Sequence, residues 1–231
     1  EHEGREIIVV SEYGITSVTD AVHINRALRR ACLIQVRLEL GREVLDPGAS
    51  EAFAMADHQL AHVYVRALAR VGEVKALLEG LDGVDYVLDA EGLRAVGLNH
   101  TRSGELVAVS HADRWFSYYY WLDDARAPDF ARTVDIHRKP GYDPVELFVD
   151  PALRWPKLQT GWKLARRKLG QRQLLDVISP SATGLVRGSH GRPTDDPEHG
   201  PLVISSEPEM MKSGAVDALD FKALVLNHVF S

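Results

Sequence analysis

The chain has 231 residues, of which 45% are hydrophobic and 26% charged, a balance typical of a globular protein that excludes disordered and fibrous classes. Its formal net charge of −6 argues against a surface that coats nucleic acid, which needs an excess of Lys and Arg. A small anionic substrate stays compatible with this charge, because the local field matters more than the net charge.

The first half of the chain alternates short apolar runs with segments of helical spacing. Residues 6–11 predict a buried parallel strand, because the run is continuous, apolar and rich in β-branched residues. Further strands are expected at 61–65, 83–88 and 104–109, and helices at 24–31, 71–81 and 90–97. Short connections between alternating strands and helices favour an α/β fold, with a mostly parallel sheet sandwiched by helices.

The texture of the sequence changes from residue 113 onward. Trp and Tyr residues cluster there among prolines, which predicts an irregular, aromatic-rich insertion or lid. Regular structure is expected to return with a strand at 201–205 and a closing helix at 220–230. We therefore divide the chain into an α/β core at 1–112, the insertion or lid at 113–180, and the end of the core at 181–231.

The chain contains one cysteine, Cys32, so it can form neither an internal disulfide nor a Cys-based zinc cluster. No apolar run approaches the roughly 20 residues that cross a bilayer, so we expect no membrane partner. The single cysteine is compatible with a reducing compartment, and we expect a cytoplasmic location. Because the first residue is Glu1 rather than Met, we expect that a segment precedes it in the natural protein.

Two strand ends or glycine turns carry residues that suit a hydrolytic site. Glu12 and Tyr13 stand at the tip of the first strand before a glycine, where a carboxylate can reach a metal ion, although spacing alone favours a capping Glu beside a core Tyr. His190 has glycines close on both sides, and Arg192 next to it suits a phosphate oxygen. The alternative for His190, a surface turn with an incidental histidine, is equally compatible with the pattern.

A third candidate is the segment from Asp135 to Pro144. Alternation places Asp135 and His137 on one side of an extended segment, where they could share a metal ion or a proton, and Lys139 adds positive charge for an anionic ligand. The alternative is a turn whose charges face solvent. The convergence of several chemically capable side chains favours the functional interpretation.

The order of these pieces resembles the type I phosphodiesterase/nucleotide pyrophosphatase branch of the alkaline phosphatase superfamily. Its members have a strand that ends in Ser-Asp-His-Gly, a later Gly-x-His-Gly turn, then a strand and a closing helix; here the sequence reads Ser11-Glu12-Tyr13-Gly14 and Gly188-Ser189-His190-Gly191. The resemblance implies that residues 1–112 are the C-terminal part of the family's core. It also implies two divalent metal ions, usually zinc, that clamp a phosphoryl transfer started by a Thr or Ser nucleophile.

The resemblance assigns roles residue by residue. His190 matches the last metal-binding histidine, and Glu12 and Tyr13 occupy the positions of an Asp-His metal pair. Glu12 can still bind metal, and we add the hypothesis that His137 supplies the missing nitrogen ligand. Substrate contacts are then expected from Arg192, Lys139 and Tyr13.

The implied function is a metal-dependent hydrolase of phosphodiesters or nucleotide pyrophosphates, acting on a small phosphate-containing substrate rather than a nucleic-acid polymer. The family's nucleophile lies upstream of the Ser-Asp-His-Gly strand, so we expect this fragment alone to be inactive. Two alternatives stay open. One is a catalytically degenerate binding module of the same fold, which Tyr13 favours, and the other is a phosphonate or sulfate ester hydrolase.

Overall fold

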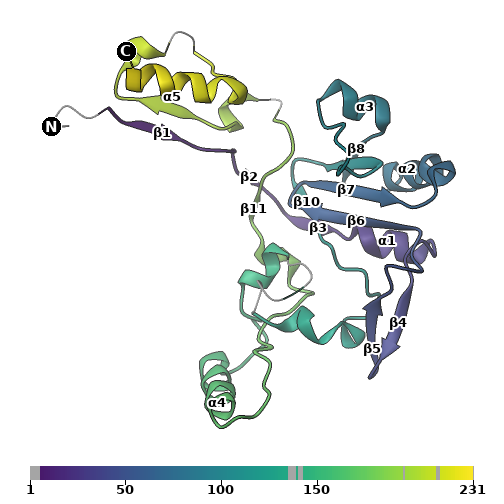
Figure 1. Cartoon of the computed structure of the whole chain (residues 1–231). Coiled ribbons are helices and arrows are strands. Elements are labelled where there is room, and N and C mark those ends of the chain that lie inside the picture. Colours follow the sequence, from purple (N-terminus) through teal and green to yellow (C-terminus); the bar gives the residue numbers. More distant parts are fainter. Residues whose placement is uncertain (1–5, 135–138, 140–142, 195, 212–213, 231) are drawn as a thin grey trace. The chain divides into compact units, whose positions relative to one another are not determined.

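The computed structural model describes residues 6–134, 139, 143–194, 196–211 and 214–230 (Figure 1). The chain forms two compact units. The smaller unit contains residues 1–15 and 193–231, and the larger unit contains residues 16–192. These boundaries differ from the expected ones at 112/113 and 180/181, and a lid role for residues 113–180 stays a prediction.

The smaller unit is a two-stranded ribbon with one helix. Strand β1 (Ile8–Val10) pairs antiparallel with β12 (Val203–Ser205), and α5 (Phe221–Phe230) places buried His228 within 2.8 Å of the Ser205 hydroxyl. The predicted strand is therefore present. The expectation that it is parallel is wrong because β1 pairs antiparallel with β12, and the expectation that it is buried is wrong because Val9 and Val10 are half exposed. A continuous apolar run predicts cover on both faces, and a ribbon with one helix does not provide it.

The larger unit is built on a four-stranded sheet. Its strands lie in the order β6 (Ala52–Asp57), β7 (Leu60–Val65), β9 (Leu106–Ser110) and β8 (Val84–Leu88). Helices α1 (Ile24–Arg30) and α2 (Val71–Glu79) pack on the main hydrophobic core, whereas α3 (Ala90–Ala95) joins a second cluster with Val107 and Val109. Strand β9 is therefore buried on both faces. Helices combined with sheets confirm the α/β class.

All three ladders of this sheet are antiparallel, which corrects the expected mostly parallel sheet for the part of the chain described. Strands β6 and β7 are joined by only His58 and Gln59, and so short a connection permits antiparallel pairing alone. The apolar run 106–109 does not indicate whether the strand pairs parallel or antiparallel, because any strand covered on both faces is continuously apolar. Parallel pairing occurs between β3 (Asp20–Val22) and β10 (Arg114–Phe116).

Three further pieces of structure were not predicted. Strands β4 (Val36–Glu39) and β5 (Arg42–Leu45) form a hairpin, and β2 (Thr16–Ser17) pairs antiparallel with β11 (Gly188–Ser189). Within the segment expected to be irregular, α4 (Pro156–Lys168) is a regular helix of 13 residues. Pro156 occupies the first turn of α4, where its missing N–H costs nothing, so this proline begins a helix rather than breaking one.

The aromatic cluster that suggested a lid is largely core. Trp115, Tyr119 and Trp121 are fully buried, and the rings of Tyr119 and Trp121 lie 4.4 Å apart. A buried amide fixes this core to the sheet. The side chain of Asn25 donates to the carbonyl oxygens of Ala54 and Tyr118 and accepts from the Ala54 N–H, at 2.8 to 2.9 Å.

Candidate functional site

Two histidines meet at one end of the sheet in the larger unit. His58 lies in the turn between β6 and β7, and His190 directly follows β11. Their ring centroids are 4.1 Å apart with an interplanar angle of 38°. The exposed carboxylate of Asp57 lies 3.8 Å from the His58 Nε2. The arrangement gathers two imidazoles and one carboxylate, which are common zinc ligands, from chain segments about 130 residues apart.

Backbone hydrogen bonds hold both histidines in place. The Gln59 N–H donates to the His190 carbonyl at 2.9 Å, and the His58 carbonyl accepts from the Phe116 N–H at 2.6 Å. Gly191 has a φ of +111°, a backbone conformation that residues with a side chain rarely adopt, so the turn requires its second glycine.

His58 itself adopts a left-handed backbone conformation, with a φ of +55°. This region is uncommon for residues other than glycine, and such residues cluster at functional sites. Burial and the neighbouring His190 lower the pKa of His58, against the opposing effect of Asp57. Both lowering effects favour the neutral imidazole.

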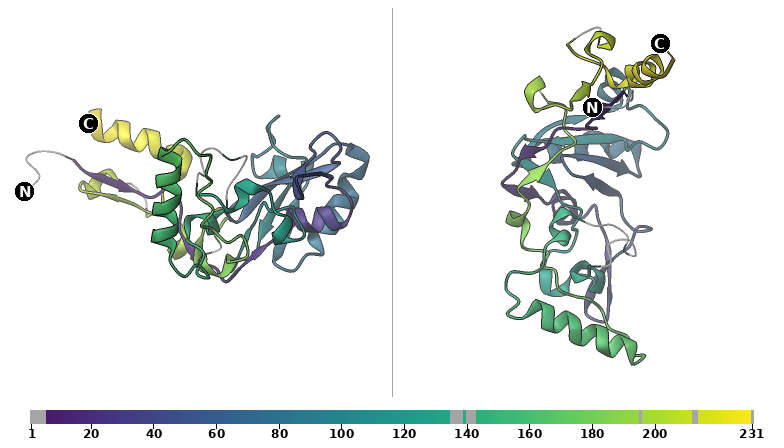
Figure 2. Two further views of the ribbon diagram at one scale, coloured as in Figure 1. Left: turned by 90° about the horizontal axis from the view of Figure 1, so that it is seen from below. Right: turned by 90° about the vertical axis from the view of Figure 1, so that its left-hand side faces the viewer.

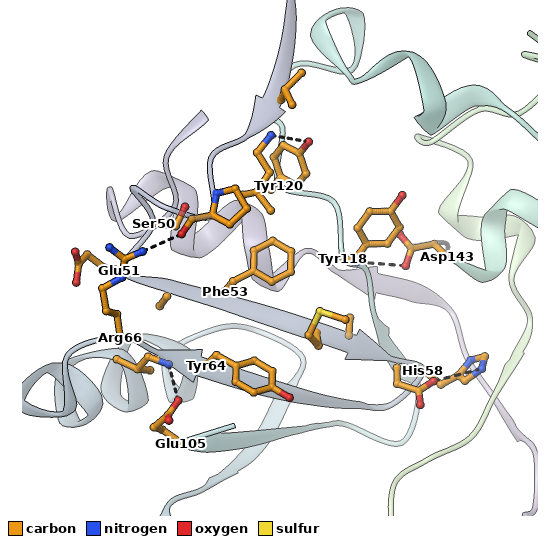
Figure 3. Close-up of a pocket in the computed structure, with 18 of the residues that line it drawn as sticks. Ser50, Glu51, Phe53, His58, Tyr64, Arg66, Glu105, Tyr118, Tyr120 and Asp143 are labelled. Atoms are coloured by element: carbon orange, nitrogen blue, oxygen red, sulfur yellow. Dashed lines mark hydrogen bonds and ion pairs between the residues drawn. The ribbon is translucent and has the colours of Figure 1, made fainter. Parts of the chain in front are cut away.

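A cavity of about 910 Å³ begins at His58 and runs along β6 and β7 (Figure 3). The rings of Phe53 and Tyr118 lie in its middle, and Arg66 lies at the end away from His58. The volume is within the range of pockets that hold small organic ligands, and mostly apolar walls with a few polar groups are typical of such pockets. The lining also includes the aromatic residues Tyr64, Tyr120 and Phe130.

One wall of the cavity rests on a buried polar cluster. Asp143 accepts hydrogen bonds from the Ser117 hydroxyl at 2.8 Å and the Tyr118 N–H at 3.2 Å. Burial raises the pKa of Asp143 well above its usual range. Glu146 accepts from the Tyr119 hydroxyl, and burial raises its pKa too, although its ion pair with Lys139 acts in the opposite direction.

The family model for type I phosphodiesterase/nucleotide pyrophosphatase matches residues 1–143. The chain belongs to this family. The match confirms the resemblance inferred from the motifs, and the family is one of phosphoester hydrolases. No curated protein matches the chain.

Two solved structures show a weak likeness to the chain. Phosphonoacetate hydrolase from Sinorhizobium meliloti 1021, in complex with phosphonoacetate, aligns with a TM-score of 0.36 and 22% identity over 50% of this chain. Murine ectonucleotide pyrophosphatase/phosphodiesterase 5 aligns with a TM-score of 0.34 and 17% identity over 51% of this chain. The chain covers only 29% and 27% of the lengths of these two proteins.

The metal ligands expected from the family motifs are distributed over both units. Glu12 and Tyr13 are exposed residues of the smaller unit, His190 belongs to the larger unit, and His137 lies outside the described residues. Among the residues that the structure describes, no group of three or more His, Cys, Asp or Glu side chains is arranged to hold a metal ion. The three-residue set therefore stays a prediction.

The expected phosphate-binding cations have protein partners. Arg192 donates from its Nη1 to the Asp85 carboxylate and to the Ser110 carbonyl, both at 3.0 Å. The Lys139 ammonium is buried, is paired with Glu146, and donates to the Thr133 carbonyl at 2.8 Å. A phosphate would reach Lys139 only if the buried cluster opened, so Arg192 is the more accessible of the two by position.

His58 was not among the predicted site residues. Its local signal is weak, because a histidine beside a glutamine between two strands usually marks an ordinary hairpin turn. The feature that distinguishes it, the ring of His190, comes from a distant segment. The pairing of β11 with β2 and the backbone hydrogen bond from Gln59 to His190 help to bring the two histidines together.

Proposed function

We propose that the chain is part of a metal-dependent hydrolase of phosphodiesters or nucleotide pyrophosphates. The observation that carries this proposal is the position of His190. It stands in a glycine turn that resembles the family's, beside His58, and His58 lines one end of a cavity that is large enough for an organic leaving group. Family membership supports the reaction class, and the cavity supports a small substrate rather than a polymer.

The donor atoms around His190 suit a divalent metal. Imidazole nitrogens and carboxylate oxygens are the usual ligands of zinc outside cysteine sites. His58 adds an imidazole beside His190, and the Asp57 carboxylate lies near His58, but these described residues do not form a metal site by themselves. We propose His190 as a zinc ligand of the larger unit, and the assignment of Glu12 and His137 as further ligands stays a prediction from the sequence. Zinc ions supply positive charge for phosphoryl oxygens.

The chain's own residues would bind and orient the substrate. A planar leaving group such as a nucleobase would lie against Phe53 and Tyr118, because flat rings bury large apolar areas in aromatic pockets. Arg192 would contact a phosphate oxygen by exchanging its bond to Asp85, with Lys139 and Tyr13 as further substrate contacts.

The test is hydrolysis of bis-p-nitrophenyl phosphate by the natural full-length protein and its variants. We expect His190→Ala to lower kcat/KM by more than 100-fold and His58→Ala by about 10- to 100-fold, the range for residues that orient a metal ligand. His100→Ala is the matched control, since His100 is exposed and outside the site, and it should keep full activity. Full activity of His190→Ala would contradict the proposal.

A catalytically degenerate binding module is the second candidate, and Tyr13 in the position of the family's metal-binding histidine favours it. If the metal site had been lost, we would expect Tyr13 to pack in the core. Tyr13 is instead 44% exposed. A wild-type protein that binds AMP but cleaves no ester would support this candidate. Faster cleavage of a phosphonate or sulfate ester than of a phosphodiester would instead indicate a phosphonate or sulfate ester hydrolase of the same superfamily.

A further inference from the structure

One segment of the larger unit has a charge opposite to that of the whole chain. Residues 151–175 contain seven basic residues and no Asp or Glu, although the chain carries a net charge of −6. The seven are Arg154, Lys157, Lys163, Arg166, Arg167, Lys168 and Arg172. Most of this charge lies on α4 or next to its ends. A run of one sign this dense indicates an interaction with an anionic partner.

Helix α4 also exposes a stripe of large apolar side chains. Trp155, Leu158, Trp162 and Leu169 follow one another at intervals of three, four and seven residues, which places them on one side of a helix. Their exposed fractions are 63%, 71%, 65% and 79%, and no residue of α4 is buried. Figure 1 and the right-hand view of Figure 2 show α4 standing away from the four-stranded sheet.

Local interactions support α4 at both of its ends. Pro156 begins it, and the three consecutive basic residues 166–168 in its last turn complement the negative end of the helix dipole. Lys163 forms an ion pair with Asp176, and the Arg166 Nε donates to the Gln171 side chain at 2.6 Å. The apolar stripe is thus presented on an ordered element.

The combination of the two features selects the partner. A nucleic acid would use the positive charge but would leave the Leu and Trp stripe in water. A second copy of α4 would cover the stripe but would bring two sets of seven positive charges together. In addition, 13 residues span about 20 Å, well short of the three to four heptads of a coiled coil. An anionic lipid surface satisfies both features, because Trp and Leu enter the interface while Lys and Arg meet the headgroups.

We propose that α4 lies on anionic membrane surfaces, with Trp155, Leu158 and Trp162 inserted at the boundary between headgroups and acyl chains. This contact is peripheral, since none of the described helices is long and apolar enough to cross a bilayer. The sequence prediction of no membrane partner considered spanning segments only. The proposal goes beyond the phosphodiesterase activity and does not depend on it.

The experiment is co-sedimentation of the 231-residue chain with vesicles of phosphatidylcholine alone or of phosphatidylcholine and phosphatidylserine at a 7:3 ratio. We expect binding to the mixed vesicles only, a blue shift of the tryptophan emission, and release in 0.5 M NaCl, because salt screens exposed charges. The triple variant Arg166→Gln, Arg167→Gln, Lys168→Gln should bind about 100-fold more weakly, at roughly fivefold per basic residue.

Two single variants test whether vesicle binding depends on the apolar stripe of α4 or on exposed apolar residues in general. Trp162→Ala should weaken vesicle binding at least tenfold, whereas Leu68→Gln, which changes a similarly exposed apolar residue outside α4, should leave it unchanged. Trp162 and Leu68 are exposed, so the circular dichroism and Tm of these two variants should match the wild type. Arg166 is half-buried and bonds to Gln171, so the helix content of the triple variant is measured by circular dichroism beside its vesicle binding. Equal binding to both vesicle types, no binding to either, or wild-type binding by Trp162→Ala would overturn the proposal.

Discussion

Replacement of Asn25 by alanine tests how the core of the larger unit is held together. The Asn25 side chain satisfies three backbone groups, the N–H and C=O of Ala54 and the C=O of Tyr118, and it is fully buried. A buried polar group left without a partner costs about 1–3 kcal/mol. Three such groups in Asn25→Ala predict a loss of about 3–6 kcal/mol in the free energy of unfolding, with water in the vacated space offsetting part of the upper range.

Urea unfolding followed by tryptophan fluorescence is a suitable assay, because buried Trp115 and Trp121 both belong to the larger unit. Asn99→Ala is the matched control, since Asn99 is exposed and the change should stay within about 0.5 kcal/mol. Asn25→Asp keeps the shape but cannot donate to the two carbonyls, so it should destabilise at least as much as alanine. A loss below about 1 kcal/mol in Asn25→Ala would refute the assigned role.

Further predictions concern a buried acid and two glycines. Burial raises the pKa of Asp143 above its ordinary 3.8, so the unfolded chain binds fewer protons above pH 4 and wild-type stability falls as pH rises toward the folded-state pKa. Asp143→Asn should therefore gain stability relative to wild type as pH rises above 4 in urea unfolding, and a constant difference would contradict this. In the smaller unit, a Cβ on Gly14 would overlap the His199 carbonyl oxygen, so Gly14→Ala should raise amide exchange throughout that unit. Gly161→Ala, in open space on α4, should instead raise helicity by circular dichroism, with a gain near 1 kcal/mol.

Helices were predictable where one face alone meets the core. Val74 and Leu78 of α2 are four residues apart and both fully buried, so the periodicity of the sequence reports the packing directly. Helix α4 escaped prediction because neighbouring prolines and tryptophans suggested an irregular segment, while Pro156 in fact occupies a helical first turn. The direction of the sheet escaped prediction because a doubly covered strand looks the same in parallel and antiparallel sheets.

The candidate site was predictable only in its local part. The turn around His190 can be recognised from adjacent glycines, and Gly191 has the positive φ that such a turn needs. His58 depends on a contact across about 130 residues, which no local pattern encodes. The burial of Lys139 depends likewise on Glu146 and on three-dimensional packing, so its charge alone suggested an exposed phosphate ligand.

The most direct test of the phosphodiesterase proposal is metal removal and restoration on the natural full-length protein. Metal content would be measured by mass spectrometry, and hydrolysis of bis-p-nitrophenyl phosphate would be followed before chelation, after chelation and after addition of zinc. We predict about two zinc ions per chain, loss of activity with the metal, recovery with zinc, and reduced metal content in His190→Ala but not in His100→Ala. A protein that holds no metal, or that hydrolyses the ester equally well after chelation, would contradict the account.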